Sequence, residues 1–200
     1  MPAQIAVIDN DSLNFLTKTE RSIPIFSILR SLFRGLYVPE EVKTEFERNM
    51  PQDAAHQRVL SQIRFSNSFL ILCSTYDTFS KILLEGVKDI DRGEAEAFAQ
   101  YKKINAHFII SDDRKFASAV RLQDPTVRII DTVLLFAWLD QLALLLNPKA
   151  HLRALYQQRR FTPQQLRNAY KQAAGMLGKK LSNRELQRKT NFKLLGIKVQ

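Results

Sequence analysis

The alternation of short apolar runs with longer amphipathic segments constrains this 200-residue chain more than any other feature. Five runs have the length and the Ile, Val, Leu and Phe content of buried strands. They are IAVID (5–9), LYVP (36–39), FLILCS (69–74), HFIIS (107–111) and VRIID (127–131). Strands that alternate with helices form a mostly parallel sheet with helices on both faces. The pattern therefore predicts a three-layer α/β/α fold. The predicted helices cover 12–19, 22–34, 40–49, 53–64, 76–85, 93–105, 113–122 and 132–146.

Charge is distributed unevenly along the chain, although the net charge is +10. Residues 1–146 carry 17 Lys and Arg against 19 Asp and Glu, whereas residues 147–200 carry 13 Lys and Arg against Glu185 alone. We therefore expect an α/β body over 1–146 and a basic helical extension over 147–200. A basic extension indicates a polyanionic partner, most often nucleic acid, ahead of an acidic protein or a merely solubilising tail.

Two segments of the extension have the spacing of a capping box at a helix start. Thr162 precedes Gln165 by three residues, and Ser182 precedes Glu185 by the same interval. Glycines separate the two segments, so the sequence predicts two short helices joined by a turn. We interpret them as a helical hairpin that packs on the body, in preference to a helix-turn-helix, because a recognition helix needs more specific features than basic charge.

The composition excludes several classes of protein. Cys73 is the only cysteine and the three histidines are scattered, so neither a disulfide framework nor a zinc site is expected. The N-terminus has no signal-peptide pattern, and the most apolar segment, 132–146, is interrupted by Asp140 and is too short to span a bilayer. These features predict a cytoplasmic protein without a membrane partner.

Acidic residues follow the ends of the predicted strands. The carboxyl ends of parallel strands meet at one edge of the sheet, so we expect these acids to lie close together. Clustered carboxylates repel each other, and a divalent cation removes that conflict. Oxygen ligands without His or Cys select a hard ion, Mg²⁺ or Mn²⁺. The acids in question are Asp9, Glu41, Glu45, Glu94, Glu96, Asp112 and Asp113.

Helical geometry separates some of these acids from others. At about 100° per residue, Glu94 lies on the same side of its predicted helix as Phe98 and Tyr101, whereas Glu96 lies on the opposite side. We therefore expect Glu94 to face the sheet and Glu96 to face solvent. Periodicity does not separate Asp112 from Asp113.

Four acidic segments are spread over about 1–131: AVIDNDSLNFL, LYVPEEVKTEF, DRGEAEAFA and FIISDDRKF. Together, and in this order, they resemble a PIN-domain nuclease. The family usually has Thr or Ser after the first Asp, where this chain has Asn10, and nothing beyond about 147 matches the family core. The acidic quartet that the resemblance implies is Asp9, Glu45, Glu94 and Asp113.

The resemblance also implies further properties of the site. Ser111 falls where the family often has a hydroxyl residue that helps to orient the site, and Asp112 is the alternative to Asp113. The implied activity is Mg²⁺- or Mn²⁺-dependent hydrolysis of phosphodiester bonds by an endonuclease. Single-stranded RNA is the expected substrate, although nothing in the sequence excludes DNA. A toxin role, an antitoxin partner and a homo-oligomer are implied in the same way.

Two other functions are compatible with parts of the sequence. Asp9 and Asp11 resemble the DxD pair of haloacid-dehalogenase-type phosphatases, in which the first Asp is the nucleophile. Ser12 and Leu13 replace the usual Gly-Thr of those enzymes, and Glu94 would have no role. The other alternative is a non-catalytic protein whose basic extension binds nucleic acid or a partner, with no dependence on Mg²⁺.

Overall fold

The computed structural model describes residues 4–48 and 53–197, which form two compact units. The first unit covers Met1–Asp131 and the second covers Thr132–Gln200. The sequence placed the boundary after residue 146. The units divide earlier because α8 (Thr132–Gln141) packs on α10 (Pro163–Met176) in the second unit.

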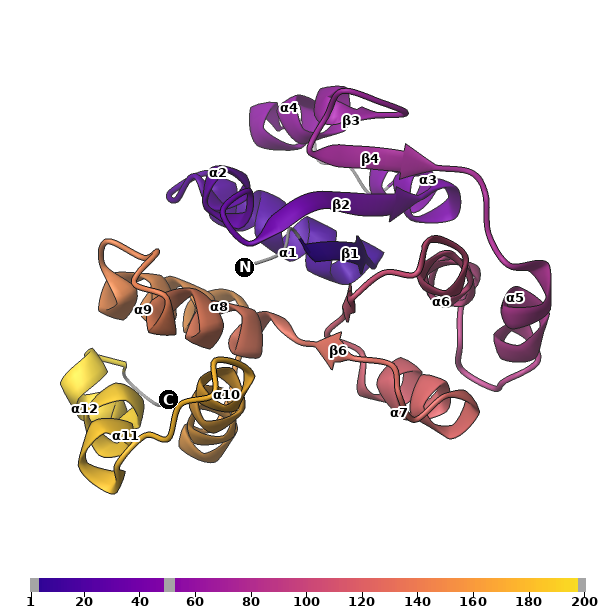
Figure 1. Cartoon of the computed structure of the whole chain (residues 1–200). Coiled ribbons are helices and arrows are strands. Elements are labelled where there is room, and N and C mark those ends of the chain that lie inside the picture. The colour runs from indigo at the N-terminus through magenta and orange to yellow at the C-terminus, as the bar shows by residue number, and fades with distance from the viewer. Residues whose placement is uncertain (1–3, 49–52, 198–200) are drawn as a thin grey trace. The chain divides into compact units, whose positions relative to one another are not determined.

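The first unit contains a six-stranded sheet in which every strand pairs with its neighbours in parallel (Figure 1). The strand order is β3-β4-β2-β1-β5-β6. Five of the six strands overlap the predicted runs, and β3 was missed because its two residues were assigned to the end of the predicted helix 53–64. The strands are β1 (Gln4–Ile8), β2 (Phe33–Pro39), β3 (Ile63–Arg64), β4 (Leu70–Cys73), β5 (Phe108–Ile110) and β6 (Ile129–Ile130).

Seven helices of the first unit lie among the described residues, close to the predicted ranges. The predicted helix 22–34 is much shorter in the structure, because β2 already begins at Phe33. Residue 49, the end of the predicted helix 40–49, lies outside the described residues. The helices are α1 (Asn10–Glu20), α2 (Ile25–Leu29), α3 (Glu40–Arg48), α4 (Ala54–Gln62), α5 (Thr78–Glu85), α6 (Arg92–Ile104) and α7 (Arg114–Gln123).

Both faces of the sheet are buried. On one face, Val7 and Ile109 pack in a cluster with Phe98 of α6 and Phe116 of α7. Ile8, whose side chain points to the other face, is also 0% exposed. Burial on both faces explains why the strands are nearly continuous apolar runs, and it confirms the predicted three-layer α/β/α arrangement.

The chain changes direction within the sheet at β1. It runs from β1 to β2 and β4 on one side, and then returns through α5 and α6 to β5 on the other side (Figure 1). The backbone amide of Asp9 donates a hydrogen bond to the carbonyl oxygen of Ile110, at 3.1 Å, so the ends of β1 and β5 are joined. Ligands of open parallel sheets bind at such a switch point, beyond the carboxyl ends of the strands.

The second unit is helical over its described residues. Thr162 and Ser182 are the N-caps of α10 and α11 and each forms a complete capping box, which confirms both predicted helix starts. Tyr156, Phe161 and Phe192 pack edge to face with ring centroids 5.3–5.8 Å apart. The helices of the unit are α8, α9 (Pro148–Gln158), α10, α11 (Asn183–Thr190) and α12 (Phe192–Leu195). In the described ranges, none of the helices has the length and apolarity needed to cross a membrane.

Candidate active site

The first unit has an acidic cavity of about 140 Å³ at the switch point between β1 and β5. The four acids of the predicted quartet all line it, although they come from separate elements. Three further acids that the sequence analysis did not assign to the site also line it. The lining residues are Asp9, Asn10, Asp11, Glu45, Asp89, Asp91, Gly93, Glu94 and Asp113.

Asp9 follows β1 directly and is the N-cap of α1. Its Oδ1 accepts a hydrogen bond from the backbone amide of Ser12 at 2.8 Å, which fixes the carboxylate at the carboxyl end of β1. The side chain is 3% exposed. Burial raises the pKa of Asp9 to about 7, although hydrogen bonds from Ser111 and Ser12 act in the opposite direction.

Asp113 holds the corresponding place after β5, as the N-cap of α7. Its Oδ1 accepts from the amides of Lys115, at 2.6 Å, and Phe116, at 2.8 Å. Ser111 is 2% exposed, and its Oγ accepts from the amide of Asp113 at 3.1 Å. The predicted hydroxyl residue therefore holds the turn that carries Asp113. Asp112 does not line the cavity, so the structure favours Asp113 of the two neighbouring acids.

Glu94 lies in the first turn of α6 and forms a capping box with Asp91. Its Oε2 accepts from the amide of Asp91 at 3.1 Å, and its own amide donates to Oδ1 of Asp91 at 2.8 Å. Burial raises the pKa of Glu94 to about 8, with further repulsion from Asp91, Asp113 and Asp9. Asp91 was missed as a site residue, although an Asp three positions before a Glu is a recognisable capping signal.

Glu45 reaches the cavity from α3 and lies against Gly93 of α6. A Cβ atom at position 93 would lie 3.1 Å from Oε1 and 3.2 Å from Oε2 of Glu45. The absent side chain therefore makes room for this carboxylate at the start of α6. Burial raises the pKa of Glu45 to about 7, and Asp91 and Glu41 add to the shift.

The raised pKa values of these three acids have the same two causes. Asp9, Glu45 and Glu94 are withdrawn from water beside other carboxylates, so ionisation of any of them is opposed by desolvation and by neighbouring negative charge. At neutral pH the cavity needs either bound protons or a positive counter-charge. A bound cation meets this need without losing the acids as ligands.

The donor set fits a hard divalent ion. Within residues 4–48 and 53–197, no three His, Cys, Asp or Glu side chains are already gathered in an ion-binding arrangement. The carboxylates of Asp9, Asp113 and Glu94 instead accept hydrogen bonds from helix N-termini, each through one of its two oxygens. The other oxygen of each takes no part in these caps. The side chains known to line the cavity, all from the described part of the chain, offer oxygen and no sulfur or imidazole, which is the chemistry that Mg²⁺ and Mn²⁺ prefer.

The prediction that Glu96 faces solvent is wrong. Its side chain is 3% exposed, and its Oε2 accepts from the backbone amide of Glu41 at 3.1 Å. The helical projection assumed that α6 buries one face, but α3 and α5 both pack on α6 in addition to the sheet. Gln100, on the same side as Glu96, is also 0% exposed and donates to the carbonyl oxygen of Cys73.

The sequence of this chain matches the DUF3368 family of PIN domains over residues 5–176, and no curated protein matches it. The chain therefore belongs to the PIN-domain family, as the four acidic segments suggested. PIN domains are in general nucleases, typically ribonucleases, and they generally use divalent metal ions. The match extends to Met176, the last residue of α10, and so beyond residue 131, the end of the region over which the four resembling segments are spread.

Proposed function

We propose that this protein is an endoribonuclease that hydrolyses phosphodiester bonds with Mg²⁺ or Mn²⁺. The observation that carries the proposal is the convergence of Asp9, Glu45, Glu94 and Asp113 on one cavity. These four residues come from the turn after β1, from α3, from α6 and from the turn after β5, so their meeting is a property of the tertiary fold. The same four would hold the ion.

When bound, a divalent ion in such a site lowers the pKa of water and stabilises negative charge on the phosphate and the leaving oxygen. The side chains of the protein supply the geometry. Asp9 and Asp113 are fixed by the backbone amides that they cap, and Ser111 fixes the turn beneath Asp113. Among the residues described by the structure, no Ser, Cys or His lines the cavity, which agrees with attack by water in place of a protein nucleophile.

The cavity also bears on the phosphatase alternative. Asp9 and Asp11 both line it, as that alternative requires. Glu45 and Glu94 line it as well, and a mechanism based on an aspartyl nucleophile gives them no role. The nuclease gives a role to all four acids of the quartet and is therefore the better account of the site.

The basic second unit is proposed to contact the RNA. It carries 13 Lys and Arg against Asp140 and Glu185, so it attracts a polyanion that the acidic cavity would repel. The toxin role and the antitoxin partner extend the same proposal. They predict that expression of the wild-type protein arrests growth, whereas expression of Asp9→Asn does not.

The proposal is tested with labelled single-stranded RNA and DNA, incubated with the protein in Mn²⁺, in Mg²⁺ and in EDTA. We expect cleavage of RNA in either ion and none in EDTA. Asp9→Asn should be inactive, because Asn can still cap α1 but offers no carboxylate. Glu85→Gln is the matched control, since Glu85 is an exposed acid of α5 outside the cavity. Cleavage in EDTA, or by Asp9→Asn, would refute the proposal.

A further inference from the structure

Glu96 is a buried carboxylate that the proposed chemistry does not use. It lies on α6, and its hydrogen-bond donor, the amide of Glu41, lies in the first turn of α3. The first amides of a helix have no partner within the helix. β2 ends at Pro39 and α3 begins at Glu40, so the residue before α3 has no side-chain oxygen that could act as a cap. Glu96 supplies this cap from another helix.

The bond joins the two helices that carry acids of the cavity. Glu45 is one helical turn after Glu41 on α3, and Glu94 is two residues before Glu96 on α6. The close approach of Glu45 to Gly93 shows that the two helices meet at this level. A shift of either helix would therefore change the separation of the two carboxylates.

We infer that Glu96 is a positioning residue, which holds α3 against α6 so that Glu45 and Glu94 can share one divalent ion. The inference rests on the proposed function. It assigns Glu96 no contact with the ion or with RNA. Glu96 contributes a hydrogen-bond acceptor at a fixed position. The amide oxygen of a Gln side chain can replace this acceptor, whereas an apolar side chain cannot.

The test compares Glu96→Gln, which keeps an acceptor, with Glu96→Met, which has similar length and none. The readouts are the Mn²⁺ concentration that gives half of the Mn²⁺-induced rise in melting temperature, and the kcat and KM for RNA. We expect Glu96→Met to raise the Mn²⁺ midpoint by about tenfold and to lower kcat, as loss of support for metal ligands generally does. Glu96→Gln should change the midpoint by less than about threefold.

Asp77→Ala is the matched control. Asp77 caps α5 by accepting from the amide of Ser80 at 2.8 Å, and no residue of α5 lines the cavity. Its loss should lower the melting temperature without moving the Mn²⁺ midpoint. An unchanged midpoint in Glu96→Met, or an equal effect of Glu96→Gln, overturns the inference. A wild-type protein that shows no Mn²⁺ response contradicts the proposed function itself, so the two failures are distinguishable.

Should Glu96→Met fail to fold, amide hydrogen exchange in the wild type provides the test. First-turn amides exchange rapidly unless a partner outside the helix protects them. The amide of Glu41 should therefore be protected well above the level of an open first turn, and it should lose that protection in a folded Glu96→Ala variant. Rapid exchange at Glu41 in the wild type overturns the inference.

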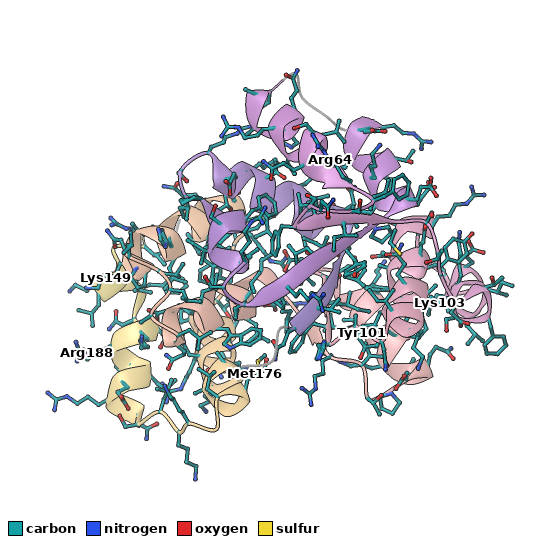
Figure 2. All side chains as sticks on the ribbon, turned by 45° about the horizontal axis from the view of Figure 1, so that its top comes forward. Arg64, Tyr101, Lys103, Lys149, Met176 and Arg188 are labelled. Carbon is teal, nitrogen blue, oxygen red and sulfur yellow. The ribbon has the colours of Figure 1, made fainter. Side chains whose placement is uncertain are left out.

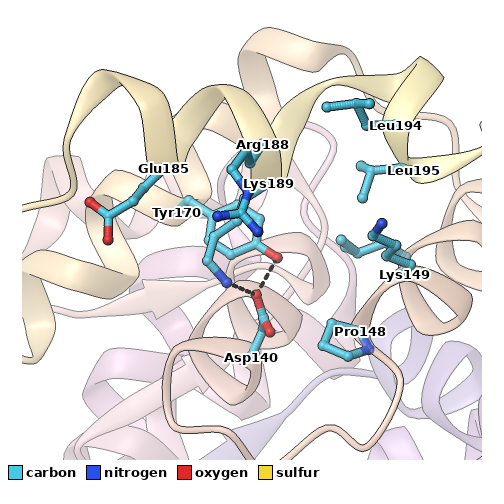
Figure 3. A pocket seen from close by; sticks show the side chains of 10 residues that line it. Asp140, Pro148, Lys149, Tyr170, Glu185, Arg188, Lys189, Leu194 and Leu195 are labelled. Carbon is cyan, nitrogen blue, oxygen red and sulfur yellow. Dashed lines mark hydrogen bonds and ion pairs between the residues drawn. The ribbon is translucent and has the colours of Figure 1, made fainter.

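A second inference comes from an independent feature, a cavity of about 470 Å³ within the second unit (Figure 3). Asp140 lies at its base with a side chain that is 8% exposed. It accepts from the hydroxyl of Tyr170 at 2.7 Å and from Nζ of Lys189 at 2.6 Å. The buried carboxylate therefore holds the Lys189 ammonium in a fixed place at the cavity.

Two further cations line the cavity, Lys149 of α9 and Arg188 of α11, and both project from the helices of this unit (Figure 2). Among the described residues, neither has a carboxylate partner. Glu185 also lines the cavity, but its carboxylate accepts from the amide and hydroxyl of Ser182, and it lies at the end away from Lys149 (Figure 3). Positive charge therefore dominates the side of the cavity where Lys149 and Arg188 lie.

Apolar side chains complete the cavity. Leu152 and Leu195 are buried at its wall, and Leu194 is 53% exposed at its edge. The cations suit the phosphates of single-stranded nucleic acid, and the exposed Leu194 offers an apolar contact to an unpaired base. The volume lies within the range of sites that enclose a ligand of a few rings.

We propose that this cavity binds a nucleotide of single-stranded RNA, with phosphate at Lys149 and Arg188. This proposal names the surface through which the proposed nuclease holds its substrate. The probe is a fluorescent oligouridine of about ten residues, bound in EDTA to the full chain carrying Asp9→Asn. Binding is thus measured without cleavage, and the result tests the proposed binding site independently of the nuclease activity.

The decisive comparison is between two double variants with the same change of charge. Lys149→Ala with Arg188→Ala removes two cations of the cavity, and Lys179→Ala with Lys180→Ala removes two exposed cations outside it. We expect a loss of about tenfold or more from the first and less than about threefold from the second. Equal losses of affinity in the two double variants would indicate diffuse electrostatic attraction and would overturn the proposed binding site. If polyglutamate displaces the fluorescent probe as effectively as unlabelled RNA does, the proposal is also overturned, in favour of an acidic protein partner.

Discussion

The two units of this protein differ in how their charges are placed. Residues 1–131 carry 18 Asp and Glu with 17 Lys and Arg, and the acids of the cavity are gathered at one edge of the sheet. Residues 132–200 carry 13 Lys and Arg and two acids. Their described part, residues 132–197, contains helices and no strand. A cluster of carboxylates repels a polyanion, so an acidic site that acts on RNA benefits from cations elsewhere in the same chain.

The units also differ in how firmly their charges are held. Asp9 and Asp113 are bound to backbone amides at the starts of helices, and Asp9 is almost fully buried. Lys149 and Arg188 are exposed. Removing one fixed, buried acid should therefore have a large effect, whereas removing one exposed cation should have a small effect that depends on salt.

The largest effect is expected for Asp113→Asn, which should lower kcat by roughly 10³-fold because a charged ligand is lost from the metal site. Asp112→Asn should lower it by less than about tenfold, since Asp112 does not line the cavity. Initial rates with labelled RNA at saturating Mn²⁺ measure both. Asn retains the capping function at position 113, so circular dichroism should be unchanged. Full activity of Asp113→Asn would show that the cavity is not the active site, and equal losses in the two variants would show that both carboxylates are used.

The basic unit should give an effect of intermediate size that varies with salt. For single strands, log K falls with log salt at about −0.7 per phosphate contact, so six contacts by the second unit give a slope of about −4. Lys149→Ala with Arg188→Ala should reduce the slope by about 1.4. Titrations of inactive protein with RNA at several salt concentrations measure this. An unchanged slope in this double variant would contradict the inferred contact between the second unit and RNA.

Truncation of the chain is a poor test of whether the cations of the second unit contact RNA. Cutting after Asn147 removes α10, on which α8 packs, and uncovers the apolar side chains of α8. Loss of RNA binding in that fragment would then reflect unfolding as well as lost charge. Point substitutions of exposed cations avoid the ambiguity.

Gly93→Ala should have a smaller effect, confined to the acidic unit. The new Cβ would lie 3.1 Å from Oε1 of Glu45, so the carboxylate must move and kcat should fall by roughly tenfold. The melting temperature should not fall in proportion, because Ala stabilises a helix relative to Gly by about 0.5–1 kcal/mol. Parallel activity and thermal-unfolding measurements separate the two quantities. A variant with full activity would show that the place of Glu45 is unimportant.

The smallest expected effect is a pH dependence of stability without metal. The pKa values of Glu45 and Glu94 are raised to about 7 and about 8 in the folded protein. For such groups, the contribution to stability is full below the unfolded pKa of about 4.3 and is lost as pH rises through the folded pKa. Glu94→Gln, which keeps the capping box, should therefore raise the melting temperature in EDTA at pH 8.5 by a few degrees and not at pH 4.

Differential scanning calorimetry of wild type and Glu94→Gln at the two pH values measures this difference, and other titrating groups cancel in the comparison. Mn²⁺ should reverse the order at pH 8.5, because only the wild type keeps the full set of ligands. A Glu94→Gln variant less stable than wild type at pH 8.5 in EDTA would contradict the repulsion inferred for the cavity.

Local sequence determined the elements and the chemistry of the acids. Five of the six strands were visible as apolar runs because both faces of a parallel sheet are buried. The capping boxes at Thr162 and Ser182 were visible because a cap depends on residues three positions apart. Strand ends of a parallel sheet lie at one edge, so the sequence predicted that acids from distant segments lie close together. The resemblance to PIN domains then selected Asp9, Glu45, Glu94 and Asp113 among these acids, and all four line the cavity.

Only the tertiary structure decided which helix faces are covered. Glu96 was assigned to solvent because a helical projection shows one apolar stripe, whereas α6 is packed by the sheet, α3 and α5 on different sides. α8 was assigned to the first part of the chain because it follows the last strand, but it buries its apolar surface against α10. The sequence pattern of a helix shows an apolar stripe, but it does not show how many partners cover the helix or which segments supply them. The contacts of α6 with α3 and α5, and of α8 with α10, set the place of Glu96 and the boundary of the units.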